Sequence, residues 1–188
     1  MVQQAHYFYA LELPAEVKRY LEKAAEGLKQ QLAFKTWVHP HDYHITLAFL
    51  GNAPFDAIDT SNRRIEEALE GLAPFELRID HLGTFGRKDS PRIFWAGLER
   101  SLALAALREK VFSACLDAGF TLEKRPFSPH ITIARRWLDE APYTYGQNPF
   151  EGGLPFCADR VVLYKTHLGN SPKYEPITIF PLAVRKDG

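Results

Sequence analysis

The sequence predicts a single domain of mixed strands and helices, covering residues 1–188 and built as two similar lobes. Residues 44–48 read His-Ile-Thr-Leu-Ala and residues 130–134 read His-Ile-Thr-Ile-Ala, an offset of 86 positions. A repeat that long, which occurs only twice and continues without gaps, favours internal duplication within one domain. Further segments related by the same offset are Phe8-Tyr9-Ala10 with Phe94-Trp95-Ala96, Leu77 with Leu163, and His81-Leu82-Gly83 with His167-Leu168-Gly169.

Length and composition fit one globular domain with a full core, since 46% of the 188 residues are hydrophobic. Lys plus Arg and Asp plus Glu number 23 each, so the chain has no net positive charge to attract a long nucleic acid. A nucleic acid would have to be bound locally, at an end or over a few nucleotides. Neither a membrane-spanning run nor a signal peptide is recognisable. Cys115 in a helical pattern and Cys157 in a loop-like region indicate neither a disulfide framework nor a zinc site. We expect a cytoplasmic monomer without membrane contacts.

The first half reads as an alternation of strands and helices. An aromatic and apolar strand ends at Pro14, which suits the first turn of a helix, and apolar residues then recur at helical spacing up to Leu32. A second helix is expected to stop at Gly71, because glycine is the usual residue after a helix. The expected elements are strands at 7–13, 44–50 and 75–79, with helices at 14–32 and 56–69.

The second half repeats this order as far as the second motif and then departs from it. Residues 139–155 are rich in proline and glycine, which predicts a loop where the first half has a helix. Loops of this length in compact domains are often functional, although a spacer is the commoner explanation. The expected elements are strands at 93–98, 128–134, 160–166 and 177–184, with a helix at 102–118 that ends at Gly119.

Each His-x-Thr string is expected to present its imidazole and hydroxyl on one face of a strand. Side chains alternate across a strand, so the two apolar residues of each string would anchor it in a core. His44 and Thr46 of the first string, and His130 and Thr132 of the second, would then face a shared space. Two facing imidazoles are what paired acid and base catalysis requires, so the strings predict an active or binding site.

Other histidines are weaker candidates. His39, His41 and His44 could be read as a metal cluster, but Pro40 lies among them and no further ligand type is spaced suitably around His130. We therefore expect no metal, and His39 and His41 as solvated loop residues. His81 and His167 each begin a His-Leu-Gly string, for which a structural turn is favoured over catalysis.

Basic residues flank the second motif. A guanidinium binds phosphate through a bidentate fork, which makes Arg135 a candidate substrate-binding residue. Strict alternation points Arg135 away from His130, so it reaches the site only if the strand ends or bulges there. Arg136 is expected to be a solvated rim residue, and Lys124 and Arg125 precede the motif.

These strings resemble the 2H phosphoesterase superfamily, and within it the RNA 2′,3′-cyclic phosphodiesterases, also called 2′-5′ RNA ligases. The resemblance covers nearly the whole chain. One departure is Lys165-Thr166-His167, where relatives often carry a serine-containing variant, and it bears on substrate preference rather than on the chemistry. The matching segments are Phe8-Tyr9-Ala10-Leu11 with Pro14, Trp37-Val38, residues 44–51, residues 82–85, residues 125–135, and Leu163-Tyr164 with Tyr174.

The resemblance implies a bilobal α+β fold, with two antiparallel sheets flanking a central cleft and helices on the outside. It implies metal-independent and cofactor-free hydrolysis of RNA 2′,3′-cyclic phosphodiester ends to a 2′-phosphate. By this resemblance, His44 gives a proton to the leaving ribose oxygen and His130 takes one from water. Thr46, Thr132 and Arg135 would hold the phosphate oxygens. RNA ends or small cyclic nucleotides are the expected partners.

Two other functions remain open from the sequence. The same catalytic core could act on another cyclic nucleotide or a 2′-5′ oligonucleotide, which the residues of the nucleoside pocket would decide. The second is a non-catalytic module that binds a nucleotide or an RNA end. The presence of both histidines and both threonines argues against this second function, because pure binding has little use for two proton carriers.

Overall fold

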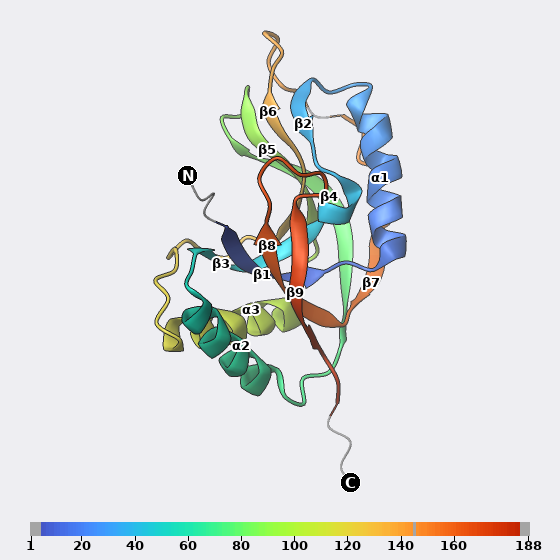
Figure 1. The fold of residues 1–188 in the computed structure, drawn as a ribbon. Coiled ribbons are helices and arrows are strands. Elements are labelled where there is room, and N and C mark those ends of the chain that lie inside the picture. The colour runs from blue at the N-terminus through green and yellow to red at the C-terminus, as the bar shows by residue number, and fades with distance from the viewer. Residues whose placement is uncertain (1–4, 145, 185–188) are drawn as a thin grey trace.

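The computed structural model describes residues 5–144 and 146–184, and the chain has the expected α+β fold with two antiparallel sheets (Figure 1). The first half contains β1 (His6–Glu12), α1 (Ala15–Lys29), β2 (Phe34–Trp37), the short 3-10 helix η1 (Pro40–Asp42), β3 (His44–Asn52), α2 (Phe55–Leu69) and β4 (Phe75–Gly86). The second half contains β5 (Pro91–Leu98), α3 (Leu102–Asp117), β6 (His130–Trp137), β7 (Leu154–Ala158), β8 (Arg160–Thr166) and β9 (Tyr174–Pro181).

The two halves of the chain exchange strands between the sheets. Sheet A has the order β3-β1-β8-β9, and sheet B has the order β2-β6-β5-β4-β7. β3 and β1 lie side by side in sheet A, and their counterparts at the offset of 86, β6 and β5, lie side by side in sheet B. The next strand of each sheet comes from the other half, β8 in sheet A and β4 in sheet B. Neither sheet is therefore made by one repeat alone.

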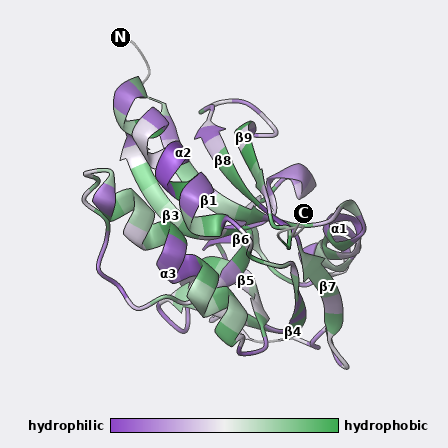
Figure 2. Cartoon of the chain, turned by 90° about the horizontal axis from the view of Figure 1, so that it is seen from below, coloured by the Kyte–Doolittle hydropathy of each residue, from purple (hydrophilic) through white to green (hydrophobic). Residues whose placement is uncertain are grey.

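The helices cover the outer sides of the sheets. α2 and α3 lie side by side and pack against β9 and β3 of sheet A, while α1 packs along β2 and η1 (Figure 1). The buried residues of α1 recur at helical spacing: Val17, Leu21, Ala25 and Leu28. Figure 2 shows hydrophilic and hydrophobic residues alternating around α1 and α2, as in helices that bury one face. No helix in the described residues is long and apolar enough to cross a membrane.

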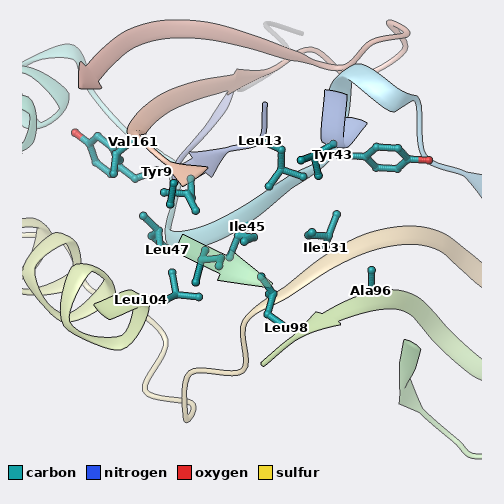
Figure 3. Packing of buried hydrophobic residues seen from close by; sticks show 14 of the residues in the cluster. Tyr9, Leu13, Tyr43, Ile45, Leu47, Ala96, Leu98, Leu104, Ile131 and Val161 are labelled. Carbon is teal, nitrogen blue, oxygen red and sulfur yellow. The ribbon is translucent and has the colours of Figure 1, made fainter. Parts of the chain in front are cut away.

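The apolar residues of the two motifs lie in the core, as expected. Ile45 and Leu47 of β3 are 0% and 3% exposed, and Ile131 and Ile133 of β6 are fully buried. Figure 3 shows Ile45 and Leu47 pointing into the cluster that also contains Leu104 of α3. Burying such a side chain stabilises a fold by about 1.5–3 kcal/mol. The core thus fixes the backbone on which the histidines and threonines stand.

Each motif strand contains a β-bulge at the same point of the repeat. The pairing of β1 with β3 skips Leu47, and the pairing of β5 with β6 skips Ile133, its counterpart at the offset of 86. A bulge shifts the alternation of side chains by one residue. The alanine after each bulge is therefore buried, and the residue after that alanine, Phe49 in β3 and Arg135 in β6, is exposed.

Several expectations from the sequence are wrong because strands extend further, or form where the local pattern indicated a loop. The strand expected at 75–79 continues to Gly86, so His81 lies within β4 rather than at a turn. The loop expected at 139–155 ends before β7, which places Cys157 in a strand instead of a loop. In each case pairing with a neighbouring strand, β5 for β4 and β4 for β7, decides the conformation.

Smaller differences concern the ends of elements. β2 was not expected, because four residues are too short to show a periodic pattern. The last strand, β9, covers Tyr174–Pro181 rather than 177–184, and β6 begins at His130 and not at residue 128. The helices end at Lys29 and Asp117 instead of at residues 32 and 118. His167 does stand at a turn, as expected, since its carbonyl accepts the N–H of Asn170.

Candidate active site

The two motif histidines open β3 and β6 and make the same backbone contact. His44 Nδ1 lies 2.7 Å from the carbonyl oxygen of Asp42, and His130 Nδ1 lies 2.8 Å from the carbonyl oxygen of Ser128. A carbonyl oxygen only accepts hydrogen bonds, so Nδ1 must carry a proton in both rings. Nε2 is therefore the nitrogen that can gain or lose a proton during a reaction.

The structure brings the two imidazoles into one electrostatic environment. A charge on His130 lowers the pKa of His44, although the two rings stand on different sheets. His44 Nε2 lies 3.0 Å from the hydroxyl of Thr46. Thr132 pairs with Trp95 of β5 and is half-buried on the strand that carries His130. Both walls of the site thus present a histidine followed by a threonine.

Burial makes both imidazoles hard to protonate. Burial away from solvent lowers the pKa of His44 to about 4. The backbone carbonyl and the carboxylate of Asp42 raise this pKa, but by less than burial lowers it. Burial also lowers the pKa of His130, and the charge of Arg135 lowers it further. The imidazoles are therefore neutral at neutral pH, and an anion bound between them would raise their pKa values.

Aromatic rings hold each imidazole in place. The ring centroid of His44 is 4.9 Å from Phe8, 5.2 Å from Tyr174 and 6.1 Å from Tyr164, all in sheet A. On sheet B, His130 lies 4.8 Å from Phe85 and 6.2 Å from Trp95. Sequence reasoning did not assign these rings to a site, because aromatic residues in strands are usually core residues. Their position beside the histidines follows from strand pairing, which the motifs do not encode.

Arg135 points into the site because of the bulge in β6. Its positive charge favours the ionised form of Tyr174, on the opposite sheet, and the neutral form of His130. The condition set by the sequence, a bulge in the strand, is thus met. Arg136 has a φ of 63° and is exposed, which takes its side chain away from the direction of its neighbour.

Asp42 is a site residue that sequence reasoning missed. Its carboxylate is buried and accepts the backbone N–H of Lys173 at 2.9 Å and that of Tyr174 at 3.2 Å. Asp42 therefore ties the start of β9 to the turn that precedes His44. The available signal was an acidic residue two positions before the histidine, but such residues usually face solvent.

The remaining candidates stand apart from this arrangement. His41 donates its backbone N–H to Nδ1 of His39, and the described residues contain no group of three His, Cys, Asp or Glu side chains placed to bind a metal together. His81 contacts Asp80, and His167 contacts Glu175. Arg125 is exposed and pairs with Glu123.

Known proteins resemble the chain over most of its length. The sequence profile described as the 2'-5' RNA ligase superfamily matches residues 13–170. A Geobacillus stearothermophilus protein named RNA 2',3'-cyclic phosphodiesterase is 43% identical over 192 residues, covering 100% of this chain but 60% of that protein, so the chain spans less than two thirds of it. A Bacillus subtilis (strain 168) protein of the same name is 37% identical over 179 residues, covering 95% of this chain and 97% of that protein.

A solved structure shares the arrangement of the two sheets. The crystal structure of E. coli LigT complexed with 3'-AMP superposes with a TM-score of 0.81, covering 96% of this chain and 99% of that chain. The two sequences are 23% identical. This similarity confirms the fold expected from the duplicated motifs.

We expect the free energy of unfolding to fall as the pH drops from about 6.5 to about 4, because the folded protein keeps His44 neutral. The unfolded chain takes up a proton at the ordinary histidine pKa of about 6.5, whereas folded His44 takes it up at about 4. The full contribution of His44 to the free energy of unfolding is therefore present above about pH 6.5, and it is lost as the pH falls towards about 4. The slope of this loss is at most about 1.4 kcal/mol per pH unit.

Urea unfolding at about pH 7 and about pH 5 measures this effect. His44→Asn should lose less stability between the two pH values than the wild type, because asparagine does not titrate. His41→Asn removes an exposed histidine and should behave like the wild type. An equal loss in His44→Asn and in the wild type would contradict the expectation.

Asp42→Asn should lower the free energy of unfolding by about 1–3 kcal/mol, because an amide nitrogen would then face a backbone N–H in a buried place. The start of β9 should loosen as well, and hydrogen exchange at Lys173 and Tyr174 should accelerate. Asp89→Asn, which removes an exposed pair with Arg87, is the matched control and should change stability little. Unchanged exchange at Lys173 and Tyr174 would show that Asp42 does not hold this strand.

Proposed function

Because this chain belongs to the 2'-5' RNA ligase superfamily, we propose that it hydrolyses the 2′,3′-cyclic phosphate at an RNA end to a 2′-phosphate. The family expected from the two motifs is confirmed by the profile and by the identity to the Bacillus relative. One observation carries the proposal: two imidazoles, each fixed through Nδ1 by the carbonyl two residues earlier, share one site. The names of the curated relatives support the same reaction.

The chemistry needs a proton acceptor and a proton donor. His130 takes a proton from water through Nε2 as the water oxygen attacks phosphorus. The bond between phosphorus and the 3′ oxygen breaks, and His44 gives its proton to that oxygen. The product has a free 3′ hydroxyl and a 2′-phosphate. Both steps use only imidazoles, and we propose that the protein needs no metal or cofactor and acts as a monomer in the cytoplasm.

The neighbours of His44 support its role as the donor. A donor must be protonated when the reaction starts, yet burial lowers the pKa of His44 to about 4. The carbonyl and the carboxylate of Asp42 both favour the protonated ring. The negative charge of a bound cyclic phosphate would favour it further.

Hydroxyl and guanidinium groups would hold the phosphate. Thr46 and Thr132 stand two residues after the histidines, and Arg135 approaches from the same strand as His130. Charge on the phosphate oxygens grows in the transition state, so donors fixed around these oxygens stabilise it. The charge of Arg135 also acts on Tyr174 of the opposite sheet, as expected of a guanidinium between the two walls.

The direct test is hydrolysis of an RNA oligonucleotide with a 2′,3′-cyclic phosphate end, in excess EDTA. We expect turnover and a 2′-phosphate product. His44→Ala and His130→Ala should each lower kcat/KM by about 10²–10⁴-fold, the usual effect of removing a positioned acid or base. Thr46→Val and Thr132→Val should lower it less, since each removes one hydroxyl.

His41→Ala is the control, because its ring is exposed and outside the site. Near-normal turnover in either catalytic variant would refute the two-histidine mechanism. Loss of turnover in EDTA, restored by zinc or manganese, would refute the absence of a metal. A 3′-phosphate product would reverse the orientation of the substrate and the roles of His44 and His130.

Arg135→Ala should lower kcat/KM by about 10–100-fold, because a charge-assisted hydrogen bond to the phosphate is worth about 1.5–3 kcal/mol. Arg136→Ala is the matched control: it removes the same charge from the next residue, which lies beyond the bulge. The two variants should therefore differ in kinetics while their net charges are equal. Similar losses in both would indicate a general effect of positive charge rather than a phosphate contact by Arg135.

A further inference from the structure

The wall of sheet B beside His130 carries aromatic rings that lie over glycines. Trp95 of β5 pairs with Gly83 of β4, and His81 of β4 pairs with Gly97 of β5. A Cβ atom at Gly83 would lie 2.2 Å from Cη2 of Trp95, and one at Gly97 would lie 2.3 Å from Nε2 of His81. Each ring therefore occupies the space that a side chain on the opposite strand would fill. The two glycines thus leave room for aromatic rings on this part of the sheet.

The aromatic surface begins at the imidazole of His130. The ring of Phe85 lies 4.8 Å from that imidazole and 5.1 Å from the ring of Trp95. Phe85 and Trp95 are half-buried, so both keep part of their surface free. Beside His44, two of the three rings are covered, since Phe8 and Tyr164 are only 3% and 4% exposed, and Tyr174 alone is half-buried. An open aromatic surface thus adjoins the imidazole of sheet B.

Packing alone does not account for the position of Trp95. Its indole N–H is buried and has no hydrogen-bond partner among the described residues. A buried donor without an acceptor costs stability. An apolar ring at this position would cover Gly83 without that cost. We therefore expect the face of the indole to contact a ligand.

We propose that Trp95 and Phe85 form a stacking floor for the base of the nucleotide that carries the cyclic phosphate. This inference rests on the proposed function. Aromatic side chains bind unpaired bases by stacking, and they do so for every base because each has a π-face. In a nucleotide, the ribose alone separates the phosphate from the base, which matches a floor that begins beside a phosphate-binding imidazole. The substrate class is therefore a nucleoside cyclic phosphate with little preference among bases.

The experiment compares adenosine 2′,3′-cyclic phosphate with methyl riboside 2′,3′-cyclic phosphate, which has the same cyclic ester and no base. In the wild type, kcat/KM should be higher for the adenosine compound. In Trp95→Leu the ratio of the two values should fall about 10-fold or more, because stacking on one aromatic ring is lost. The loss should appear mainly in KM, since the reacting groups are unchanged.

Two further variants separate stacking from folding. Trp95→Phe keeps an aromatic face and should retain most of the ratio. Gly83→Ala leaves Trp95 in the chain but displaces its ring, so it should lower the ratio as Trp95→Leu does. Gly27→Ala on α1 has open space around its Cβ position and is the control for the glycine substitution. Thermal unfolding of each variant shows that the kinetics refer to folded protein.

An equal loss on both substrates in Trp95→Leu and Gly83→Ala would overturn the proposal, since it would indicate a structural role alone. Equal kcat/KM for both substrates in the wild type would overturn it as well. If the wild type hydrolyses neither compound nor the RNA oligonucleotide with a 2′,3′-cyclic phosphate end, the proposed function fails, and titration calorimetry with adenosine 2′-monophosphate then tests the floor by itself. Weaker binding by Trp95→Leu than by the wild type would support it, and equal binding would refute it.

Discussion

The hydrogen bond from Nδ1 of each motif histidine to the carbonyl two residues earlier is the constraint on which the site depends. It sets the tautomer, since the carbonyl can only accept, and it leaves Nε2 as the working nitrogen of both rings. The bond occurs at equivalent positions of the repeat, so the residues just before each strand make the same contact in both copies. The buried isoleucines and the buried leucine of the two motifs anchor the backbone of both strands in the core and so fix this geometry.

The β-bulges convert a duplicated strand into two different walls. Both bulges turn the residue three positions after the threonine outward, but this residue is Phe49 in one copy and Arg135 in the other. The identical backbone thus delivers an aromatic ring to one side and a guanidinium to the other. A duplication supplies two equivalent imidazoles. Different residues at the positions that a bulge turns outward then give the two imidazoles different surroundings.

The sequence predicted the parts of the fold that depend on local pattern. The offset of 86 and the alternation within each motif were sufficient to place His44, Thr46, His130 and Thr132 on facing strands. The pairing of distant strands could not be read in this way, which is why β7 and the extension of β4 were missed. Asp42 was missed for the same reason, since its partners lie in β9, more than a hundred residues away. Trp95 was not assigned to the site for the same reason, since the glycine beneath it lies on β4.

The two motif histidines differ in the charged side chains that lie near them. Burial disfavours a proton on both, and this effect is common to the two copies. Asp42 adds a negative charge that favours the protonated form of His44 and outweighs the positive charge of Lys18, whereas Arg135 adds a positive charge that favours the neutral form of His130. Environments that push two titratable groups apart are how proteins divide acid and base roles between like residues. In this chain both charged groups act at Tyr174, since its backbone N–H binds Asp42 and the charge of Arg135 favours its ionised form, so the start of β9 lies near both.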